Sequence, residues 1–141
     1  MTDKGSANCN DQAWGLPNVL NYFGNHRITS NHIYPSEWVF LRDRLREGIS
    51  ILDVGCAQGG FAGIVAEHVK DFDYTGVDIN EDMIRLAKER FPSRNFAKIE
   101  EGDLSLLADA KFSLVLVLGI LHLHESWRQT LAEAWKHCTD S

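Results

Sequence analysis

The sequence has 141 residues and a mass of 15.9 kDa, which fits one domain with its own core. Apolar residues make up 44% and charged residues 24%, which excludes a disordered chain, a collagen-like chain and a small disulfide scaffold. The longest apolar run, residues 114–121, is far shorter than the roughly 20 residues that span a bilayer. Residues 1–10 also lack the apolar region of a secretory signal, so we expect a cytoplasmic protein without a membrane span.

The net charge is −6, and the acidic excess lies in residues 51–141. Binding to bulk nucleic acid needs a basic stripe, and the largest basic group is the trio Arg42, Arg44 and Arg46. That spacing is typical of a solvated helix face, so we expect no bulk nucleic-acid partner. The three cysteines are widely spaced and form no zinc-binding motif, which indicates free thiols in a reducing compartment and no structural metal.

The first third of the chain has a weak pattern. Residues 1–12 carry few apolar groups and predict a frayed tail, whereas residues 13–34 predict a short helix and a loop. Pro35 suits the first turn of a further helix, and Gly48 suits its end. We therefore separate an N-terminal tail and possible lid, residues 1–34, from a core that begins at residue 35.

From residue 49 onward, apolar runs of strand length alternate with segments of helical spacing. The predicted strands are residues 49–54, 74–78, 95–100 and 112–118. The predicted helices are residues 61–69, 80–91 and 127–138. Strands that are apolar on both faces indicate a parallel sheet covered by helices, which is a doubly wound α/β fold. Such sheets bind ligands at the carboxyl ends of their strands, so function should lie in the turns there.

The turn after the first predicted strand is rich in glycine, with Gly55, Gly59 and Gly60. Glycines let the backbone approach a ligand closely, although the same residues would also suit a tight strand-to-helix connection. Asp53 lies two positions before the first glycine. Dinucleotide enzymes keep an apolar residue there, beside a pyrophosphate, so a carboxylate indicates a ligand with positive charge.

Two further turns carry acidic residues. Asp78 follows the second strand at about the distance from the glycine turn where an acid accepts the hydroxyls of a ribose. It could instead cap the next helix, but Asn80 already suits that role. Asp103 follows the third strand and could accept a hydrogen bond from an exocyclic amine, or be an ordinary loop residue.

The turn after the fourth strand contains His122 and His124, followed by Glu125. Imidazole is the natural base near neutral pH, and this turn would lie where a substrate meets a cofactor. Structural or capping roles are the more common use of such histidines. Two histidines and a glutamate could also suggest a metal, but no further ligands gather near them in the sequence, so we expect none.

Together the four turns resemble the motifs of the class I S-adenosylmethionine-dependent methyltransferases. The matching segments are residues 51–61, 74–79, 101–104 and 112–122, in the family's order and spacing. The resemblance covers about residues 35–141 and implies a Rossmann-like sheet with strand order 3-2-1-4. Ala57 replaces the middle glycine of the first motif, and Ser113 stands where the family commonly has Asp. We expect neither departure to change the chemistry.

The resemblance implies a set of residues that bind S-adenosylmethionine. This set is Asp53, Gly55, Cys56, Ala57, Gly59, Phe61, Asp78, Ile79, Met83, Asp103, Leu104 and Leu118. Within it, Asp53, Gly55 and Ala57 would line the methionine half and Asp78 would hold the ribose. Ile79, Asp103 and Leu104 would contact the adenine, and Leu118 would lie under the sulfonium. His122 is the candidate base, should the acceptor need to lose a proton.

The resemblance also bears on the lid and the acceptor. In similar enzymes a segment like residues 31–40 covers the cofactor, so His32, Tyr34 and Trp38 are lid candidates, unless they only pack the helix on the sheet. The expected reaction is methyl transfer to a small-molecule, saccharide or lipid acceptor. A cofactor-binding or regulatory module without turnover is the alternative. An NAD-dependent oxidoreductase is disfavoured by Asp53.

The family's sheet usually has seven strands, whereas this sequence predicts four. In the order 3-2-1-4, residues 112–118 would form an edge strand, yet they are apolar on both faces, which is the pattern of an interior strand. We expect either that the fold continues in a longer chain or that another chain covers this edge, as in a homo-oligomer.

Overall fold

The structure is a computed structural model that describes residues 13–139. The described residues form an all-parallel, four-stranded sheet with the order β3-β2-β1-β4. The strands are β1 (Ile49–Val54), β2 (Phe72–Asp78), β3 (Asn95–Lys98) and β4 (Leu114–Leu116). The predicted fold class and strand order are therefore confirmed. The predicted tail at residues 1–12 lies outside the described residues.

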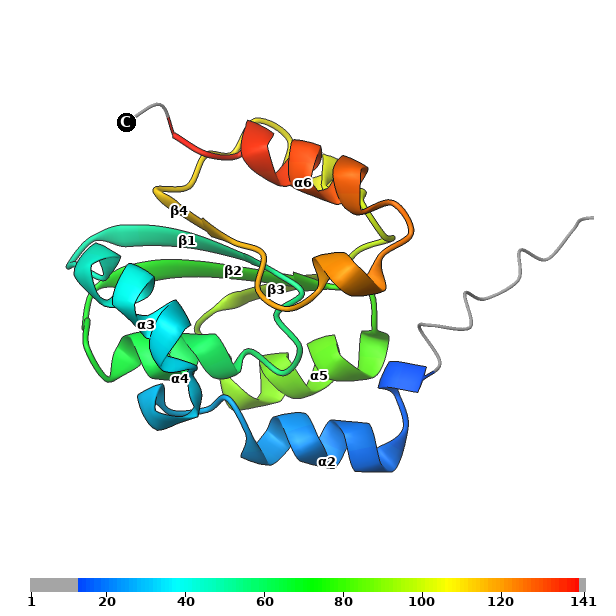
Figure 1. The fold of residues 1–141 in the computed structure, drawn as a ribbon, viewed down its shortest axis with the longest axis horizontal. Helices are drawn as coiled ribbons and strands as arrows, with labels where there is room; N and C mark the ends of the chain where they lie inside the picture. The colour runs from blue at the N-terminus through cyan, green and yellow to red at the C-terminus, as the bar shows by residue number, and fades with distance from the viewer. Residues whose placement is uncertain (1–12, 140–141) are drawn as a thin grey trace, which may run out of the picture.

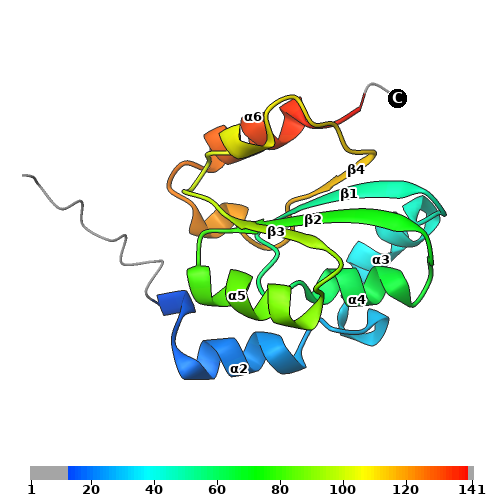
Figure 2. The ribbon, with the colours of Figure 1, turned by 180° about the vertical axis from the view of Figure 1, so that it is seen from behind.

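Helices cover both faces of this sheet (Figures 1 and 2). Helices α4 and α5 lie against one face, with α2 outside them, and α6 lies on the opposite face. The helices are α2 (Pro17–Asn25), α3 (Pro35–Leu41), α4 (Gly60–Ala66), α5 (Glu81–Arg90) and α6 (Trp127–Lys136). Short 3₁₀ turns are η1 (Ser30–His32), η2 (Arg42–Arg44), η3 (Ser105–Leu107) and η4 (Leu121–Leu123). None of the helices in residues 13–139 is long and apolar enough to cross a membrane.

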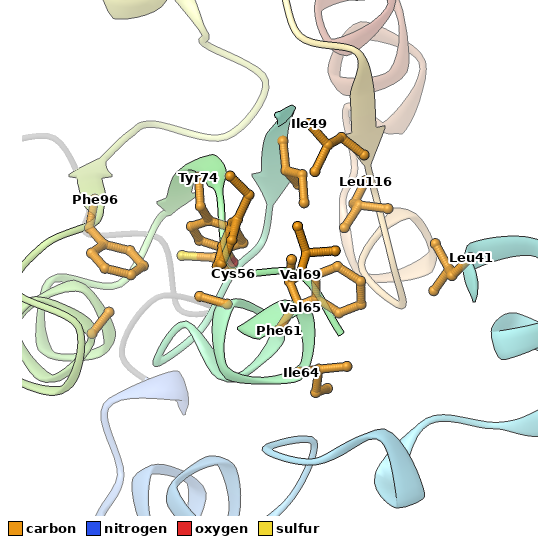
Figure 3. Packing of buried hydrophobic residues seen from close by; sticks show 14 of the residues in the cluster. Leu41, Ile49, Cys56, Phe61, Ile64, Val65, Val69, Tyr74, Phe96 and Leu116 are labelled. Atoms are coloured by element: carbon orange, nitrogen blue, oxygen red, sulfur yellow. The ribbon is translucent and has the colours of Figure 1, made fainter. Parts of the chain in front are cut away.

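Successive residues of β1 face opposite sides of the sheet, and nearly the whole strand is buried because helices cover both sides. Ile51 packs in the cluster under α4, whereas Leu52 and Val54 pack in a second cluster with Ala134 of α6. Figure 3 shows the first cluster from close by, with Tyr74 of β2 inside it. The two clusters hold the sheet between its helical layers and so fix the carboxyl ends of β1 and β2.

Helix α5 begins as the sequence predicts. The Oδ1 atom of Asn80 accepts the backbone N–H of Met83 at 3.0 Å, so Asn80 is the N-cap. Met83, Ile84 and Ala87 are buried against the sheet. Asn80, and not Asp78, is therefore the side chain that caps this helix.

Strand β4 is shorter than the predicted 112–118. Its ladder with β1 joins residues 51–53 to Leu114–Leu116. At its start, side chains replace backbone pairing: the N–H of Ser113 donates to Ser50 Oγ, and the N–H of Ser50 donates to Ser113 Oγ, both at 3.0 Å. Ser113 thus ties the strand pair together. Within residues 13–139, no strand pairs with the other side of β4.

The apolar spacing in residues 127–138 predicts an amphipathic helix, and α6 confirms the helix. Its large apolar side chains, however, point away from the sheet: Trp127, Leu131 and Trp135 are exposed, the last by 76%. The buried residues of α6 are Thr130 and Ala134. The chain that follows α6 bonds to Phe112, whose N–H donates to the carbonyl of His137 at 2.8 Å, and this contact fixes the rotation of the helix.

Candidate functional site

A pocket lies at the carboxyl ends of β1, β2 and β4, where a parallel α/β sheet is expected to bind ligands. Three segments of the core line it: residues 53–58, 60 and 61 at the end of β1 and beyond, Asp78 and Ile79 at the end of β2, and residues 118–120 after β4. The N-terminal segment closes the remaining side through several residues between Trp14 and Ile33. The pocket is mainly apolar, with a few charged groups among its walls.

The glycine turn after β1 is held close to β2. The N–H groups of Gly55 and Cys56 both donate to the carbonyl of Val77, at 2.8 and 3.0 Å. Gly55 has a φ of +84°, and a Cβ atom there would lie 2.6 Å from Ile120 Cγ2. Glycine is therefore required at this position, because a side chain would meet both strain and a clash at the wall of the pocket.

Ala57, which occupies the family's middle glycine position, has a φ of +48°. A left-handed backbone costs a non-glycine residue about 1–2 kcal/mol, which a glycine would avoid. Glycine in turn gives the unfolded chain more conformational entropy, which lowers stability by about 0.4–1 kcal/mol. We expect Ala57→Gly to raise the free energy of unfolding by about 0.5–1 kcal/mol in urea denaturation. The control is Ala62→Gly in α4, where Gly should instead lower stability by about 1 kcal/mol. Destabilisation by both changes would refute strain at Ala57.

Asp53 is a buried acid at the end of β1, with only 5% of its surface exposed. Its Oδ2 atom accepts a hydrogen bond from the hydroxyl of Tyr74 at 2.5 Å. Burial raises the pKa of Asp53 to about 6; the Tyr74 hydrogen bond and Arg27 lower it, and the charge of Asp78 raises it. The carboxylate therefore lies in a pocket wall where a cationic ligand would stabilise its charged form.

Asp78 connects the turns after β1 and β2. Its Oδ2 atom accepts the N–H of Ala57 at 2.9 Å, and its Oδ1 atom accepts the N–H of Asn80 at 3.0 Å. These two bonds fix the orientation of Asp78 between the turns. The side chain lines the pocket.

Most of the predicted cofactor contacts line this pocket. They are Asp53, Gly55, Cys56, Ala57, Phe61, Asp78, Ile79, Met83 and Leu118. They come from three turns that are far apart in the sequence, and the strand order brings them together. Burial raises the pKa of the Cys56 thiol well above its usual value, so this cysteine acts as an apolar part of the wall.

Three of the predicted cofactor contacts do not line the pocket. Gly59 is the left-handed N-cap of α4 and packs against Phe96. Leu104 is buried in the second core cluster, on the α6 side. Asp103 is exposed, and its Oδ1 atom accepts the N–H of Ser105 at 2.9 Å at the start of η3. Their roles toward a cofactor stay predictions.

The two histidines of the fourth turn differ in position. His122, the predicted base, is exposed and does not line the pocket, whereas His124 does. The Nδ1 atom of His124 lies 3.1 Å from the Oγ1 atom of Thr130, a buried residue of α6. The sequence provided no basis for choosing His122 or His124 as the base. The 3₁₀ turn η4, which contains His122 and ends before His124, determines which of the two side chains lines the pocket. In residues 13–139, no cluster of three or more side chains could hold a metal ion.

The sequence did not identify the N-terminal wall. Pocket-lining residues there are Trp14, Phe23, His26, Arg27 and Ile33. The lid candidates His32, Tyr34 and Trp38 are not among them, and Trp38 packs on His68 at a ring distance of 4.9 Å. Trp14 and Phe23 belong to the apolar stretch that predicts a short helix, and no sequence signal marked Arg27.

Arg27 brings a positive charge to the pocket. Its Nη2 atom lies 2.9 Å from Glu37 Oε2 of α3. The segment that carries it is also tied to the glycine turn, since Gln58 Nε2 donates to the carbonyl of Leu20 at 2.5 Å. The pocket therefore contains an acid, Asp53, and a base, Arg27, of opposite charge.

A parallel sheet of this order, with a glycine turn and two acids at its carboxyl edge, defines a Rossmann-like ligand-binding protein. Residues 51–141 match the family described as "Methyltransferase domain", and the chain belongs to that family. The resemblance that the four motifs indicate is thereby confirmed.

Two curated relatives and one solved structure illustrate the similarity. The phthiotriol/phenolphthiotriol dimycocerosates methyltransferase of Mycobacterium tuberculosis is 32% identical over 88 residues, which are 61% of this chain and 32% of that protein. The fatty-acid O-methyltransferase of Mycolicibacterium smegmatis is 35% identical over 91 residues, 62% of this chain and 32% of that protein. This chain thus matches about a third of the length of these relatives. A TehB-like SAM-dependent methyltransferase from Corynebacterium glutamicum has a TM-score of 0.62 at 25% identity, covering 90% of this chain and 64% of that one.

Proposed function

We propose that this chain binds S-adenosylmethionine and takes part in methyl transfer to a small-molecule, saccharide or lipid acceptor. The observation that carries the proposal is the pocket beside the glycine turn, where Asp53 and Asp78 meet an apolar wall. Membership of the methyltransferase family supports it.

The charged groups of the pocket fit the methionine half of this cofactor. That half carries an ammonium and a carboxylate, and Asp53 and Arg27 offer the two opposite charges in one pocket. A buried carboxylate is costly unless it is paired, so a cationic ligand gives Asp53 a reason to be there. The lack of a side chain at Gly55 lets Ile120 pack directly on the glycine turn and complete the apolar wall on this side.

The other half of the pocket fits a nucleoside. Asp78 is the proposed acceptor for the ribose hydroxyls, and Ile79 and Met83 offer apolar surface for the adenine. Asp103 and Leu104 complete the adenine contacts in this proposal. Neither lines the pocket, so their contribution requires movement of the turn after β3.

When bound, S-adenosylmethionine supplies a methyl group that its sulfonium already activates. The chain's own residues then need to bind, orient and exclude water. Leu118 is the proposed apolar contact under the sulfonium. If the acceptor has to lose a proton, His122 is the proposed base, and His124, which lines the pocket, is the neighbouring candidate.

The acceptor is proposed as a class. The relatives named above act on a fatty acid and on phthiotriol dimycocerosates, and this supports the lipid end of the range. The acidic net charge supports an acceptor other than bulk nucleic acid. Cys56 and Cys138 are both free, which supports a reducing, cytoplasmic location.

We divide the chain into a lid over residues 1–34 and a cofactor-binding core over residues 35–141. The lining residues Trp14, Phe23 and Arg27 support a covering role for the described part of the first region. Its ties to α4 support a docked position: Ser30 Oγ donates to Glu67 Oε2 at 2.8 Å.

The alternative is a module that binds the cofactor without turnover. The exposed position of His122 favours it, because it leaves the pocket without the predicted base. An NAD-dependent oxidoreductase has no support, since the family is one of methyltransferases and Asp53 stands beside the site where a pyrophosphate would lie. Release of labelled methyl groups from S-adenosylmethionine over a panel of acceptors separates turnover from binding alone.

The ribose role of Asp78 predicts a large loss of affinity. We expect Asp78→Ala to weaken S-adenosylmethionine binding by at least about tenfold in calorimetry, because a charged hydrogen-bond acceptor is removed. Asp78→Asn, which keeps one acceptor oxygen and the side-chain volume, should lie between Ala and wild type. Circular dichroism should show both variants folded. Near-unchanged affinity of folded Asp78→Ala would rule out the ribose assignment.

We also propose that a second copy of the chain covers the free edge of β4. Helix α6 carries the exposed side chains Trp127, Leu131 and Trp135, and the chain directly after it bridges to Phe112, next to β4. One apolar patch can serve both copies of a two-fold dimer. Size-exclusion chromatography with light scattering should give a dimer for wild type and a monomer for Trp135→Glu. Tyr22→Glu, in α2 on the other side of the sheet from α6, should leave the dimer intact. A wild-type monomer at micromolar concentration would contradict the proposal.

A further inference from the structure

Tyr74 is a buried tyrosine on β2 whose hydroxyl forms a hydrogen bond with one carboxylate, that of Asp53. The residue is 1% exposed and packs in the apolar cluster under α4, with its ring centroid 5.8 Å from that of Phe96 (Figure 3). Its hydroxyl donates to Asp53 Oδ2 at 2.5 Å. A buried hydroxyl needs a partner, but packing alone would be met by phenylalanine, which needs none.

The strand register explains how the two side chains meet. Asp53 lies directly opposite Gly76 in the β1–β2 ladder, and Tyr74 lies opposite Ile51, on the same face. Tyr74 is therefore the diagonal neighbour of Asp53, within reach of a long side chain. A Cβ atom at Gly76 would lie 2.8 Å from Cys56 Sγ, so no other side chain fits between the strands here.

We propose that Tyr74 is a positioning residue, which holds the Asp53 carboxylate in its charged form and aims it at the ammonium of the bound ligand. This inference rests on the proposed function, and it adds a residue that does not line the pocket itself. The hydroxyl occupies one side of Oδ2, which leaves the other carboxylate oxygen free to turn toward the pocket.

The groups around Asp53 oppose one another. From β2 come the Tyr74 hydroxyl, which favours the charged carboxylate, and Asp78, whose charge disfavours it; Arg27 of the N-terminal segment favours it. The Cys56 thiol of the glycine turn stays protonated, because burial raises its pKa well above the usual value. His124 lines the same pocket from the β4 side. Burial also raises the pKa of Tyr74 well above its usual value, so its proton remains available for donation.

Removal of the hydroxyl alone should therefore shift the titration of Asp53 upward. Burial already raises the pKa of Asp53 to about 6 with Tyr74 in place. In Tyr74→Phe the donor is lost while the ring and its packing remain. A protonated carboxyl cannot pair with an ammonium. As the pH is lowered, Tyr74→Phe should therefore lose ligand affinity at a higher pH than wild type does.

The test is the affinity for S-adenosylhomocysteine from about pH 5 to about pH 9, measured by calorimetry for wild type and Tyr74→Phe. S-adenosylhomocysteine carries the same ammonium and does not react. We expect the midpoint of the pH profile to rise by about one unit or more in Tyr74→Phe, with affinity near the wild-type value restored at high pH. Thr75→Val, which removes a hydroxyl from the next residue of β2 on the opposite face of the sheet, is the matched control and should leave the profile unchanged.

A second readout separates this inference from the proposed function. The ¹³C signal of the Asp53 carboxyl, followed against pH without any ligand, should titrate at higher pH in Tyr74→Phe than in wild type. Equal Asp53 titrations in the two folded proteins would overturn the role of Tyr74. Failure of wild type to bind S-adenosylhomocysteine would overturn the proposed function instead, and the ¹³C titration would still decide the effect of Tyr74 on Asp53.

Discussion

Asp53→Asn is expected to make the protein more stable and to weaken S-adenosylmethionine binding. The pKa of Asp53 is raised to about 6 by burial, so between its unfolded value and that pH the native state holds a proton that the unfolded state releases. Stability therefore falls as pH rises through this window, and above it the charged native carboxylate costs about 2–3 kcal/mol. Asparagine removes that cost, and its carbonyl oxygen can still accept the Tyr74 hydroxyl.

Urea denaturation at two pH values measures this effect. At about pH 8 the free energy of unfolding of Asp53→Asn should exceed that of wild type by about 1–3 kcal/mol, and near pH 4 the difference should vanish. Asp109→Asn, at an exposed position, should change little at either pH. Equal stability of Asp53→Asn and wild type at pH 8 would contradict the expected cost of burying the charged carboxylate.

The same substitution should lower the affinity for S-adenosylmethionine by roughly 30-fold or more, because truncating one partner of a buried charge pair costs about 2–5 kcal/mol. Higher stability with lower affinity is the signature of a group kept for binding. If Asp53→Asn bound the ligand as well as wild type, the ammonium would have another partner.

Gly60→Ala is expected to displace the N-terminal segment from the core. A Cβ atom at Gly60 would lie 2.3 Å from the carbonyl oxygen of Arg27, which is backbone and cannot rotate away. The segment must shift, which should cost about 1–3 kcal/mol of stability. Because Arg27 lines the pocket on that segment, ligand affinity should fall as well, by about tenfold.

Gly63→Ala provides the matched control one turn further along α4. A Cβ atom there would meet Phe91 Cζ at 3.4 Å and the carbonyl oxygen of Ile28 at 3.5 Å, both ordinary contacts. This variant should fold with wild-type or higher stability, since Ala favours a helix over Gly by about 1 kcal/mol. Thermal denaturation and calorimetry of the two variants check the prediction. Equal behaviour of Gly60→Ala and Gly63→Ala would argue against close packing of the segment on α4.

The core of the fold could be predicted because its signals are local. Strand-length apolar runs, the N-cap at Asn80 and the glycine turn each follow from a few adjacent residues, and a parallel sheet brings the strand ends together. The same logic placed Asp53 and Asp78 at one edge of the sheet, and the family resemblance added Ile79 and Leu118; all four line the pocket. Tyr74 was visible only as a strand residue, because its link to Asp53 depends on the register of β2 against β1.

The N-terminal wall and the direction of α6 depend on contacts between distant segments. Arg27 reaches the pocket because its segment packs on Gly60, and the sequence near Arg27 contains no mark of that contact. Helix α6 buries Thr130 and Ala134 and exposes Trp135, and the apolar spacing alone does not specify which of its faces meets the sheet. His124 rather than His122 lines the pocket because η4 turns the chain between them.

Isothermal calorimetry of the purified chain tests the S-adenosylmethionine site itself. Titrations with S-adenosylmethionine, S-adenosylhomocysteine and NAD should be run under one set of conditions. We predict saturable binding of the first two, because both carry the ammonium and ribose that Asp53 and Asp78 are placed to hold, and no heat from NAD. Binding of NAD, or no binding of either adenosyl compound by the folded chain, would contradict the account.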